Sequence, residues 1–249
     1  MISIRNLQKT FNPGDVNEVL ALKTVNVNIN SGEFLVIVGA NGSGKSTLLN
    51  CLAGSVLPTS GEIKIDENDV TRLPEYKRSK WIARVFQSPL LGTAPDLSIL
   101  ENFRLAALRT GSKNMSIGIK DNFKSIVQAK VATLEMGLEN KINRSMGTLS
   151  GGQRQALTLL MAVMDDVKLL LLDEPTAALD PKSAETVMKT ADQLISDYKL
   201  TAILITHNMK EAFTYGNRII QMYEGGIVRD LDSGKKKGLT HTELYDWFM

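Results

Sequence analysis

The chain passes from an apolar run through a glycine-rich turn into a helical pattern within one short stretch. The run Phe34–Val38 contains no polar side chain and predicts a buried strand. The segment GANGSGKS follows at residues 39–46, and residues 46–53 have helical spacing that stops at Gly54. Glycine permits a tight curl without Cβ clashes. The sequence therefore predicts a strand, a loop and a helix start joined in a fixed geometry.

This junction matches the pattern G-x-x-x-x-G-K-[ST] of phosphate-binding loops. The inward N–H groups of such a loop and the positive end of the following helix attract phosphate. Lys45 would supply a mobile charge for the β- and γ-phosphates, and Ser46 a hydroxyl ligand for Mg²⁺. A glycine-rich turn without a ligand is the alternative, which the strand and helix on either side disfavour. We therefore expect a nucleoside triphosphate to contact Gly39, Ala40, Asn41, Gly42, Ser43, Gly44, Lys45, Ser46 and Thr47.

The composition is that of an ordinary globular protein, with 43% hydrophobic and 22% charged residues in 249. A net charge of +2 gives no reason to expect nucleic-acid binding. No segment approaches about 18 consecutive apolar residues, and the N-terminus lacks a signal-peptide core, so we expect a cytosolic location. Cys51 lies on an apolar helix face and is expected to be a small buried hydrophobe. The basic cluster at residues 235–237 is expected to be a solvated loop and not a lipid-binding patch.

Strand and helix patterns divide the chain into three parts. The first is rich in strands, the second has helical spacing from about residue 95 to residue 164, and the third alternates strands with helices. This order predicts an α/β nucleotide-binding core interrupted by a helical insert. The expected strands cover residues 2–11, 19–29, 34–38, 62–65, 82–86, 169–172, 202–205, 219–223 and 227–228. The expected helices cover residues 46–53, 97–109, 123–136, 151–164 and 182–198.

A second glycine-rich segment, LSGGQ, occupies residues 149–153 at the start of a helical stretch. Ser150 can cap that helix, and Gln153 completes a capping-box pattern three residues later. Glycine in a first turn costs about 1 kcal/mol relative to alanine. Gly151 and Gly152 therefore make sense if something approaches the bare backbone, and the helix start is a second candidate anion site.

Two adjacent carboxylates follow the apolar run at residues 169–172. Ligands of open α/β sheets bind at the carboxyl ends of the strands, where Asp173 and Glu174 would emerge. Asp173 is placed to hold Mg²⁺, and Glu174 is placed to polarise an attacking water molecule. Adjacent acids after a strand can also form a solvated loop or a cap. The two glycine-rich motifs in the same chain favour the catalytic interpretation.

With these motifs in order, the chain resembles the ATP-binding subunits of ABC transporters, whose signature is LSGGQ. The resemblance covers essentially the whole chain and implies one ATP-binding domain, residues 1–249. Residues 1–90 and 165–249 would form a RecA-like core, with a mostly parallel sheet and an antiparallel β subdomain. Residues 91–164 would form a helical subdomain. It also implies a head-to-tail homodimer, in which the γ-phosphate held by one subunit contacts Ser150, Gly151, Gly152 and Gln153 of the other.

The same resemblance assigns three more positions. His207 matches the switch histidine near the γ-phosphate, and it would act with Lys45 and Glu174 in catalysis. Gln87 matches a glutamine that reaches Mg²⁺ and the attacking water. Phe11 falls where the family places an aromatic side chain that stacks on adenine, although many members have tyrosine there. A histidine in an ordinary loop and a phenylalanine in the core are the corresponding alternatives.

The segments FQSPLLGTAPDLSILENF, RQALTLLMAVM and TAALDPKSAETV are similar to those of tryptophan/tyrosine-type amino-acid importers. Such an importer implies a membrane permease and an extracytoplasmic solute-binding protein, with this subunit on the inner face of the cell membrane. A lipoprotein-releasing or macrolide-type export ATPase is the alternative within the family. A soluble ABC ATPase is the alternative outside transport, but such proteins usually fuse two ATP-binding units or carry long coiled coils.

Overall fold

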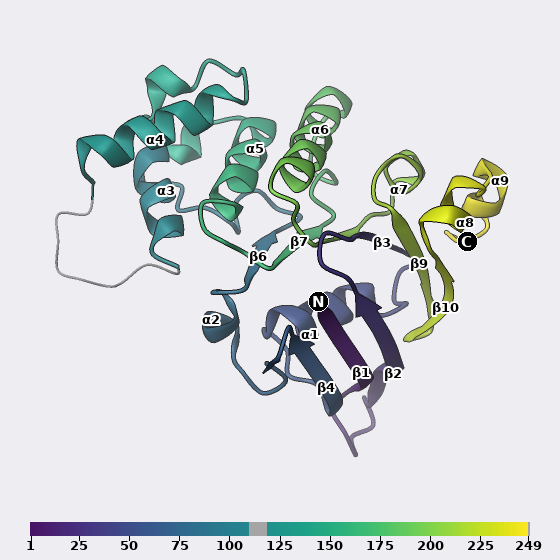
Figure 1. Ribbon diagram of the computed structural model, residues 1–249. Coiled ribbons are helices and arrows are strands. Elements are labelled where there is room, and N and C mark those ends of the chain that lie inside the picture. The colour runs from purple at the N-terminus through teal and green to yellow at the C-terminus, as the bar shows by residue number, and fades with distance from the viewer. Residues whose placement is uncertain (110–118, 249) are drawn as a thin grey trace.

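The computed structural model describes residues 1–109 and 119–248, and these residues form two β-sheets (Figure 1). The larger sheet has the order β10-β9-β3-β8-β7-β6, with every neighbouring pair from β9 to β6 parallel and β10 antiparallel to β9. Its strands are β3 (Phe34–Val38), β6 (Ile82–Val85), β7 (Leu169–Asp173), β8 (Ala202–Ile205), β9 (Arg218–Tyr223) and β10 (Gly226–Leu231).

The smaller sheet is antiparallel and has the order β2-β1-β4-β5. Its strands are β1 (Ile2–Phe11), β2 (Val19–Ile29), β4 (Ser60–Ile65) and β5 (Asn68–Asp69). The predicted α/β class, a mostly parallel sheet accompanied by an antiparallel one, is confirmed. The pair β4 and β5 forms a tight hairpin whose second strand is too short to leave a sequence pattern.

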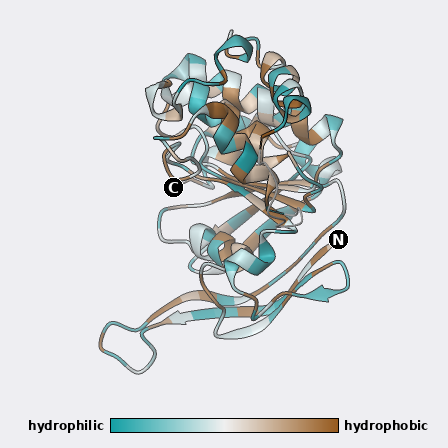
Figure 2. Cartoon of the chain, turned by 90° about the vertical axis from the view of Figure 1, so that its left-hand side faces the viewer, coloured by the Kyte–Doolittle hydropathy of each residue, from teal (hydrophilic) through white to brown (hydrophobic). Residues whose placement is uncertain are grey.

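The parallel sheet separates two apolar cores, because alternate residues of each strand point to opposite faces. On β3, Val36 and Val38 face one core, and Leu35 and Ile37 face the other. The first core also contains residues of the helices above the sheet in Figure 2, and the second contains residues of α1 and the antiparallel sheet below it. A strand buried on both faces needs apolar residues throughout, which explains the uninterrupted runs.

The principal helices begin where the sequence supplies a cap. Ser98 Oγ accepts a hydrogen bond from the N–H of Glu101, and Asp180 Oδ1 accepts one from Ser183, so α3 and α6 begin directly after these residues. The predicted helices are all present, but their ends differ by up to four residues because capping geometry fixes the boundaries. The principal helices are α1 (Lys45–Ala53), α3 (Ile99–Ala107), α4 (Asp121–Ala132), α5 (Gly151–Ala162) and α6 (Pro181–Asp197).

Several short helices were not predicted, because they are too short for apolar periodicity to appear. They include α2 (Glu75–Arg78), α8 (Ser233–Lys237), α9 (His241–Tyr245) and the 3₁₀ turns η1 (Glu139–Lys141) and η2 (Met146–Thr148). The short helix α7 (Met209–Thr214) begins after its cap Asn208. The expectation of a solvated loop at residues 235–237 is wrong. Lys236 is half-buried in α8, and its Nζ donates to the carbonyl oxygens of Tyr215 and Gly216. This burial lowers the pKa of Lys236 to about 8.

Cys51 is expected to resist alkylation until the protein unfolds. The thiol is fully buried in α1, and burial raises its pKa to about 11. At pH 8 only about one thiol in a thousand would be ionised, against about one in four for an ordinary cysteine. Mass spectrometry after treatment with iodoacetamide would measure the labelled fraction. The folded protein should stay unmodified while a urea-denatured control reacts fully, and equal rates would contradict the buried position.

Candidate active site

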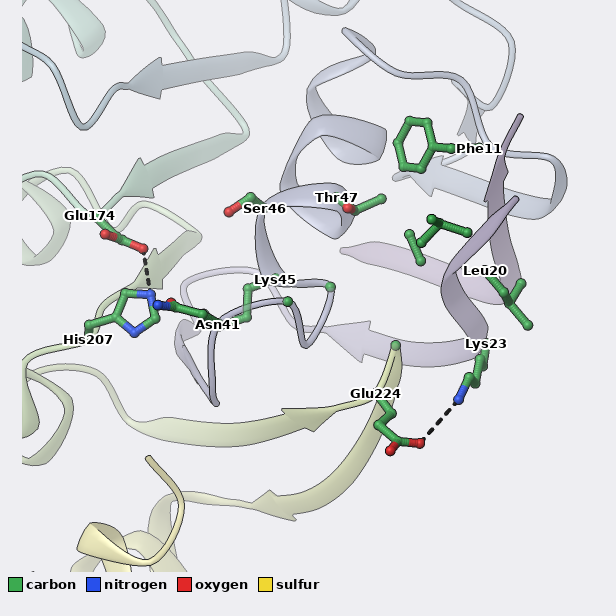
Figure 3. A pocket seen from close by; sticks show the side chains of 15 residues that line it. Phe11, Leu20, Lys23, Asn41, Lys45, Ser46, Thr47, Glu174, His207 and Glu224 are labelled. Atoms are coloured by element: carbon green, nitrogen blue, oxygen red, sulfur yellow. Dashed lines mark hydrogen bonds and ion pairs between the residues drawn. The ribbon is translucent and has the colours of Figure 1, made fainter. Parts of the chain in front are cut away.

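The loop of residues 39–46 leads from β3 into α1 at the carboxyl edge of the parallel sheet (Figure 3). Gly39 has a φ of +143°, and a Cβ there would lie 2.1 Å from the carbonyl oxygen of Met222. Gly44 has a φ of +98°, and its Cβ would lie 2.7 Å from the carbonyl oxygen of Ala21. No larger residue fits at either position, so these glycines fix the curl of the loop.

The Lys45 ammonium lies under this loop. Its Nζ donates hydrogen bonds to the carbonyl oxygens of Gly39 at 2.8 Å and Ala40 at 2.9 Å. Burial lowers the pKa of Lys45, and the nearby Glu174 carboxylate acts in the opposite direction. Gly44 caps α1 without a side chain, so the first N–H groups of the helix have no side-chain acceptor. The Lys45 ammonium and the N-terminus of α1 therefore lie at the same loop, and both attract anions.

Glu174 and His207 meet at the carboxyl ends of the neighbouring strands β7 and β8. Glu174 Oε1 lies 2.8 Å from His207 Nε2, as the dashed line in Figure 3 shows. The Glu174 N–H donates to the carbonyl oxygen of Ile205 at 3.0 Å, and Glu174 has a φ of +46°, in the left-handed region. This backbone turn aims the carboxylate away from the strand. The two predicted catalytic side chains are therefore adjacent.

A buried carboxylate that the sequence analysis missed holds the two loops together. Glu211 in α7 accepts hydrogen bonds from Thr176 Oγ1 at 2.6 Å and from Thr206 Oγ1 at 2.5 Å. Thr206 Oγ1 also accepts a bond from the N–H of Asn208. Thr176 follows Glu174 by two residues and Thr206 precedes His207, so Glu211 fixes the spacing of the pair. A glutamate on a short helix carries no signal of this role in the sequence.

A cavity of about 730 Å³ unites most of the predicted site. One end is lined by the loop and the first turn of α1 together with Glu174 and His207. The other end is lined by Phe11, Val19 and Leu20 of the antiparallel sheet, and the Lys23–Glu224 ion pair lies at its side (Figure 3). Phe11 is half-buried at the end of β1, with Lys9 Nζ 4.8 Å from the centre of its ring. The cavity thus has a phosphate-binding end and an apolar end with an aromatic ring.

The two other predicted metal ligands, Asp173 and Gln87, do not line this cavity. Asp173 Oδ2 accepts a hydrogen bond from Arg84 Nη2 at 2.5 Å, and the two side chains are 15% and 13% exposed. Gln87 follows β6 and is exposed. Arg84 is a second residue that the sequence analysis missed, because its neighbour Asp173 comes from a strand far along the chain.

The available donors suit Mg²⁺. Among the described residues, no cluster of three histidine, cysteine or acidic side chains could hold a metal alone. Ser46 lines the cavity with a hydroxyl, and Asp173 uses one carboxylate oxygen for Arg84. Mg²⁺ favours such sparse oxygen donors, because it completes its octahedron with water and substrate phosphates.

The signature segment lies at the start of α5, and none of its residues 150–153 lines the cavity. The predicted capping box is confirmed, because Ser150 Oγ accepts from the N–H of Gln153 and Gln153 Oε1 accepts from the N–H of Ser150, both at 3.2 Å. The absence of a side chain at Gly152 also has a structural reason within the same chain. A Cβ there would lie 2.7 Å from Ser183 in α6. Close helix packing explains Gly152, whereas Gly151 is exposed and meets only the tip of Leu179.

The family model described as "ABC transporter" matches residues 22–177. The chain is 38% identical to the tyrosine transport ATP-binding protein of Clostridioides difficile (strain R20291), covering 100% of this chain and 98% of that protein. It is 35% identical to the macrolide export ATP-binding/permease protein MacB of Campylobacter fetus subsp. fetus, covering 92% of this chain and 34% of that protein.

The fold is similar to a solved structure, the dimeric post-hydrolysis state of the ATP-binding cassette MJ0796 bound to ADP and Pi. The TM-score is 0.79 with 32% identity, covering 94% of this chain and 99% of that chain. This coverage extends well beyond the phosphate-binding loop.

Proposed function

Because this chain belongs to the ABC transporter family and is an ATP-hydrolysing cassette, we propose that it powers a membrane permease that imports an aromatic amino acid. Similarity to the tyrosine transport protein supports this cargo, since the identity is 38% over the whole chain, against 34% for a phosphonates import protein that covers 99% of it. One observation carries the catalytic part of the proposal, namely that Lys45, Glu174 and His207 line the same cavity.

In this proposal the two ends of the cavity bind the two ends of ATP. Residues 39–47 bind the phosphates, and Phe11 stacks on adenine at the apolar end. Glu174 accepts a proton from the attacking water, and His207, at 2.8 Å, orients that carboxylate and the γ-phosphate. Ser46, Asp173 and Gln87 would hold Mg²⁺, which would supply positive charge to the phosphates.

A second copy of the chain completes each site. Ser150, Gly151, Gly152 and Gln153 do not line the cavity of their own subunit, and Gly151 is exposed. Their helix start, with free N–H groups and a small surface, would face the γ-phosphate held by the partner. The dimeric structure of the cassette MJ0796 with bound ADP and Pi supports a dimer of this chain, for which we propose a head-to-tail arrangement.

The permease would dock on the helical subdomain, which we assign to residues 91–164. A groove of about 370 Å³ there is lined by Leu91 after Gln87, by Leu105 in α3 and by Met161 in α5. Leu91 is 70% exposed and Leu105 52% exposed, which is typical of a protein-binding surface. Among the described residues, no helix is both long and apolar enough to cross a bilayer. We propose a peripheral location for this chain on the cytoplasmic face of the membrane, beside the permease, which would receive its cargo from a solute-binding protein.

Replacing Phe11 by alanine is expected to raise the Kd for ADP about tenfold, because stacking of the adenine base on an aromatic ring contributes about 1–3 kcal/mol. The ring lines the apolar end of the cavity and is half-buried. Isothermal titration with ADP would measure the change, with Phe11→Trp as a control that keeps a stacking surface. An unchanged Kd in the alanine variant would identify Phe11 as a packing residue.

Reconstitution tests the cargo. The permease that co-purifies with this chain would be placed in liposomes with its solute-binding protein, and ATP hydrolysis would be measured with tyrosine, tryptophan, phenylalanine or no amino acid. Stimulation by an aromatic amino acid supports the proposal. Stimulation by a macrolide or a lipoprotein, without any binding protein, would instead establish export. The similarity to the macrolide export protein MacB is the reason to include this alternative. Full activity without any membrane partner would favour a soluble ATPase.

A further inference from the structure

Gln155 connects three separate segments of the chain through one side-chain amide. Its Nε2 donates to the carbonyl oxygens of Phe86 at 2.8 Å and Pro175 at 2.9 Å, and the residue is fully buried. Phe86 directly precedes Gln87, and Pro175 directly follows Glu174. We call Gln155 and these two carbonyl groups the carbonyl clamp.

The clamp acts where the sheet ends. Val85 and Leu172 form the last pair between β6 and β7, so Phe86 and Pro175 lie beyond the ladder and their carbonyl groups have no strand partner there. A buried carbonyl group requires a donor. Satisfying both groups is a structural role that any buried amide could fill. Gln155, however, lies on α5 only five residues after Ser150, so its two hydrogen bonds also connect the signature helix to the segments after β6 and β7.

Helix α5 joins the signature to the groove. It begins after Ser150, and one turn beyond Gln155 it reaches Thr158, which lines the groove with Met161 and Ala162. A helix moves as a unit because its hydrogen bonds are internal. Any displacement of α5 by an occupant of the groove must therefore pull on the carbonyl groups of Phe86 and Pro175, or break their bonds to Gln155.

The surroundings of Gln155 Oε1 bear on the orientation of the amide. Gln155 Oε1 is buried, and no partner for it exists among the described residues. Both amide hydrogens are used by the clamp, so exchanging Oε1 and Nε2 would leave the two carbonyl groups facing an acceptor. The orientation of the amide is therefore fixed by the two carbonyl groups.

We propose that Gln155 is a positioning residue that sets Glu174 for hydrolysis and ties its position to that of the signature helix. This inference rests on the assignment of Glu174 as the base in the proposed function. Gln155 does not line the nucleotide cavity. Loss of the clamp should therefore lower kcat and leave nucleotide binding unchanged.

Gln155→Leu removes both donors and keeps a similar volume. We expect kcat for ATP hydrolysis by the full chain, without a permease, to fall at least tenfold while the Kd for ADP stays within about twofold. Leu159→Ala is the matched control, because Leu159 is fully buried in the same helix and touches neither carbonyl group through a hydrogen bond. The control should lose thermal stability and keep kcat within about threefold. Should Gln155→Leu fail to fold, Gln155→Met is measured in its place.

Two further readouts separate positioning from general stability. Amide hydrogen exchange at residues 174–177 should accelerate in Gln155→Leu and not in Leu159→Ala, because Ala177 donates to the carbonyl oxygen of Glu174 in the affected loop. In Gln155→Glu, a carboxyl group can donate only when protonated, so its kcat relative to wild type should rise as pH falls from 8 to 6.

The outcomes are distinguishable. Wild-type kcat in Gln155→Leu, or equal losses in Gln155→Leu and Leu159→Ala, would overturn the clamp. Inactive Gln155→Leu together with fully active Glu174→Gln would overturn the role of Glu174 itself. Because no permease takes part, failure of the importer assignment leaves this test unaffected.

Discussion

Replacing Glu174 by glutamine is expected to lower the rate of ATP hydrolysis by about 10²- to 10⁴-fold, the contribution of a positioned general base. Glutamine has the size of glutamate but cannot accept the proton of water. The other carboxylate that lines the cavity, Glu224, lies beside Lys23 at its far side (Figure 3). Asp173 cannot substitute without giving up its bond to Arg84.

ATP should still bind to Glu174→Gln, because the loop and Lys45 are unchanged. The uncleaved nucleotide should then hold two subunits together, so light scattering is expected to show an ATP-dependent dimer that wild type does not accumulate. His207→Ala is a second variant to be measured in the same way. It removes the imidazole 2.8 Å from Glu174 and thus tests whether that contact orients the carboxylate for hydrolysis. Hydrolysis by Glu174→Gln at the wild-type rate would show that Glu174 is not the base.

Replacing Gly151 by aspartate is expected to abolish most hydrolysis without disturbing the fold. Gly151 is exposed, and a Cβ there meets only the flexible tip of Leu179 at 3.1 Å. Aspartate in the first turn suits a helix start, so α5 should remain folded. A carboxylate facing the partner's γ-phosphate would cost several kcal/mol, which predicts a loss of about 100-fold or more in kcat. Gly151→Ala is the control that adds bulk without charge.

A mixing experiment identifies the subunit on which each half of the site lies. Lys45→Ala should lose ATP binding, and Gly151→Asp should bind ATP but hydrolyse little, so each variant alone is inactive. Mixed dimers retain one site that has an intact loop and an intact signature, so the mixture should regain activity. No recovery on mixing would contradict a site shared between chains, provided that circular dichroism shows both variants folded.

The sequence predicted the sheet and the principal helices because their signals are local. The runs Phe34–Val38 and Leu169–Leu172 are apolar throughout, which is the pattern of strands covered on both faces. Helix ends were less accurate because they depend on individual caps, such as Ser98. The lysine cluster of α8 was assigned wrongly, since its buried member bonds to carbonyl groups of a distant loop.

In the candidate active site, too, residues within local motifs could be identified from the sequence, and residues that act through distant contacts could not. Lys45, Glu174 and His207, which the motifs singled out, line one cavity in the fold. The supporting residues Arg84, Gln155 and Glu211 could not be found in this way, because each acts on a partner supplied by another part of the fold. Gly152 has a second reason for its small size that the sequence does not reveal, since a Cβ there would lie 2.7 Å from Ser183.

The position of β3 within the sheet has a consequence for biosynthesis. This strand leads directly into the nucleotide loop, yet its two neighbours are β8 and β9, which end at residues 205 and 223. At a synthesis rate of about 5–20 residues per second, the ribosome needs roughly 10–40 s to supply them after β3 has been made. Until β8 and then β9 have been made, the corresponding edges of this apolar strand lack their native partners. The proposed ATP-binding segment is thus made early and assembled late, and the nascent chain carries an unpaired apolar strand through most of its synthesis.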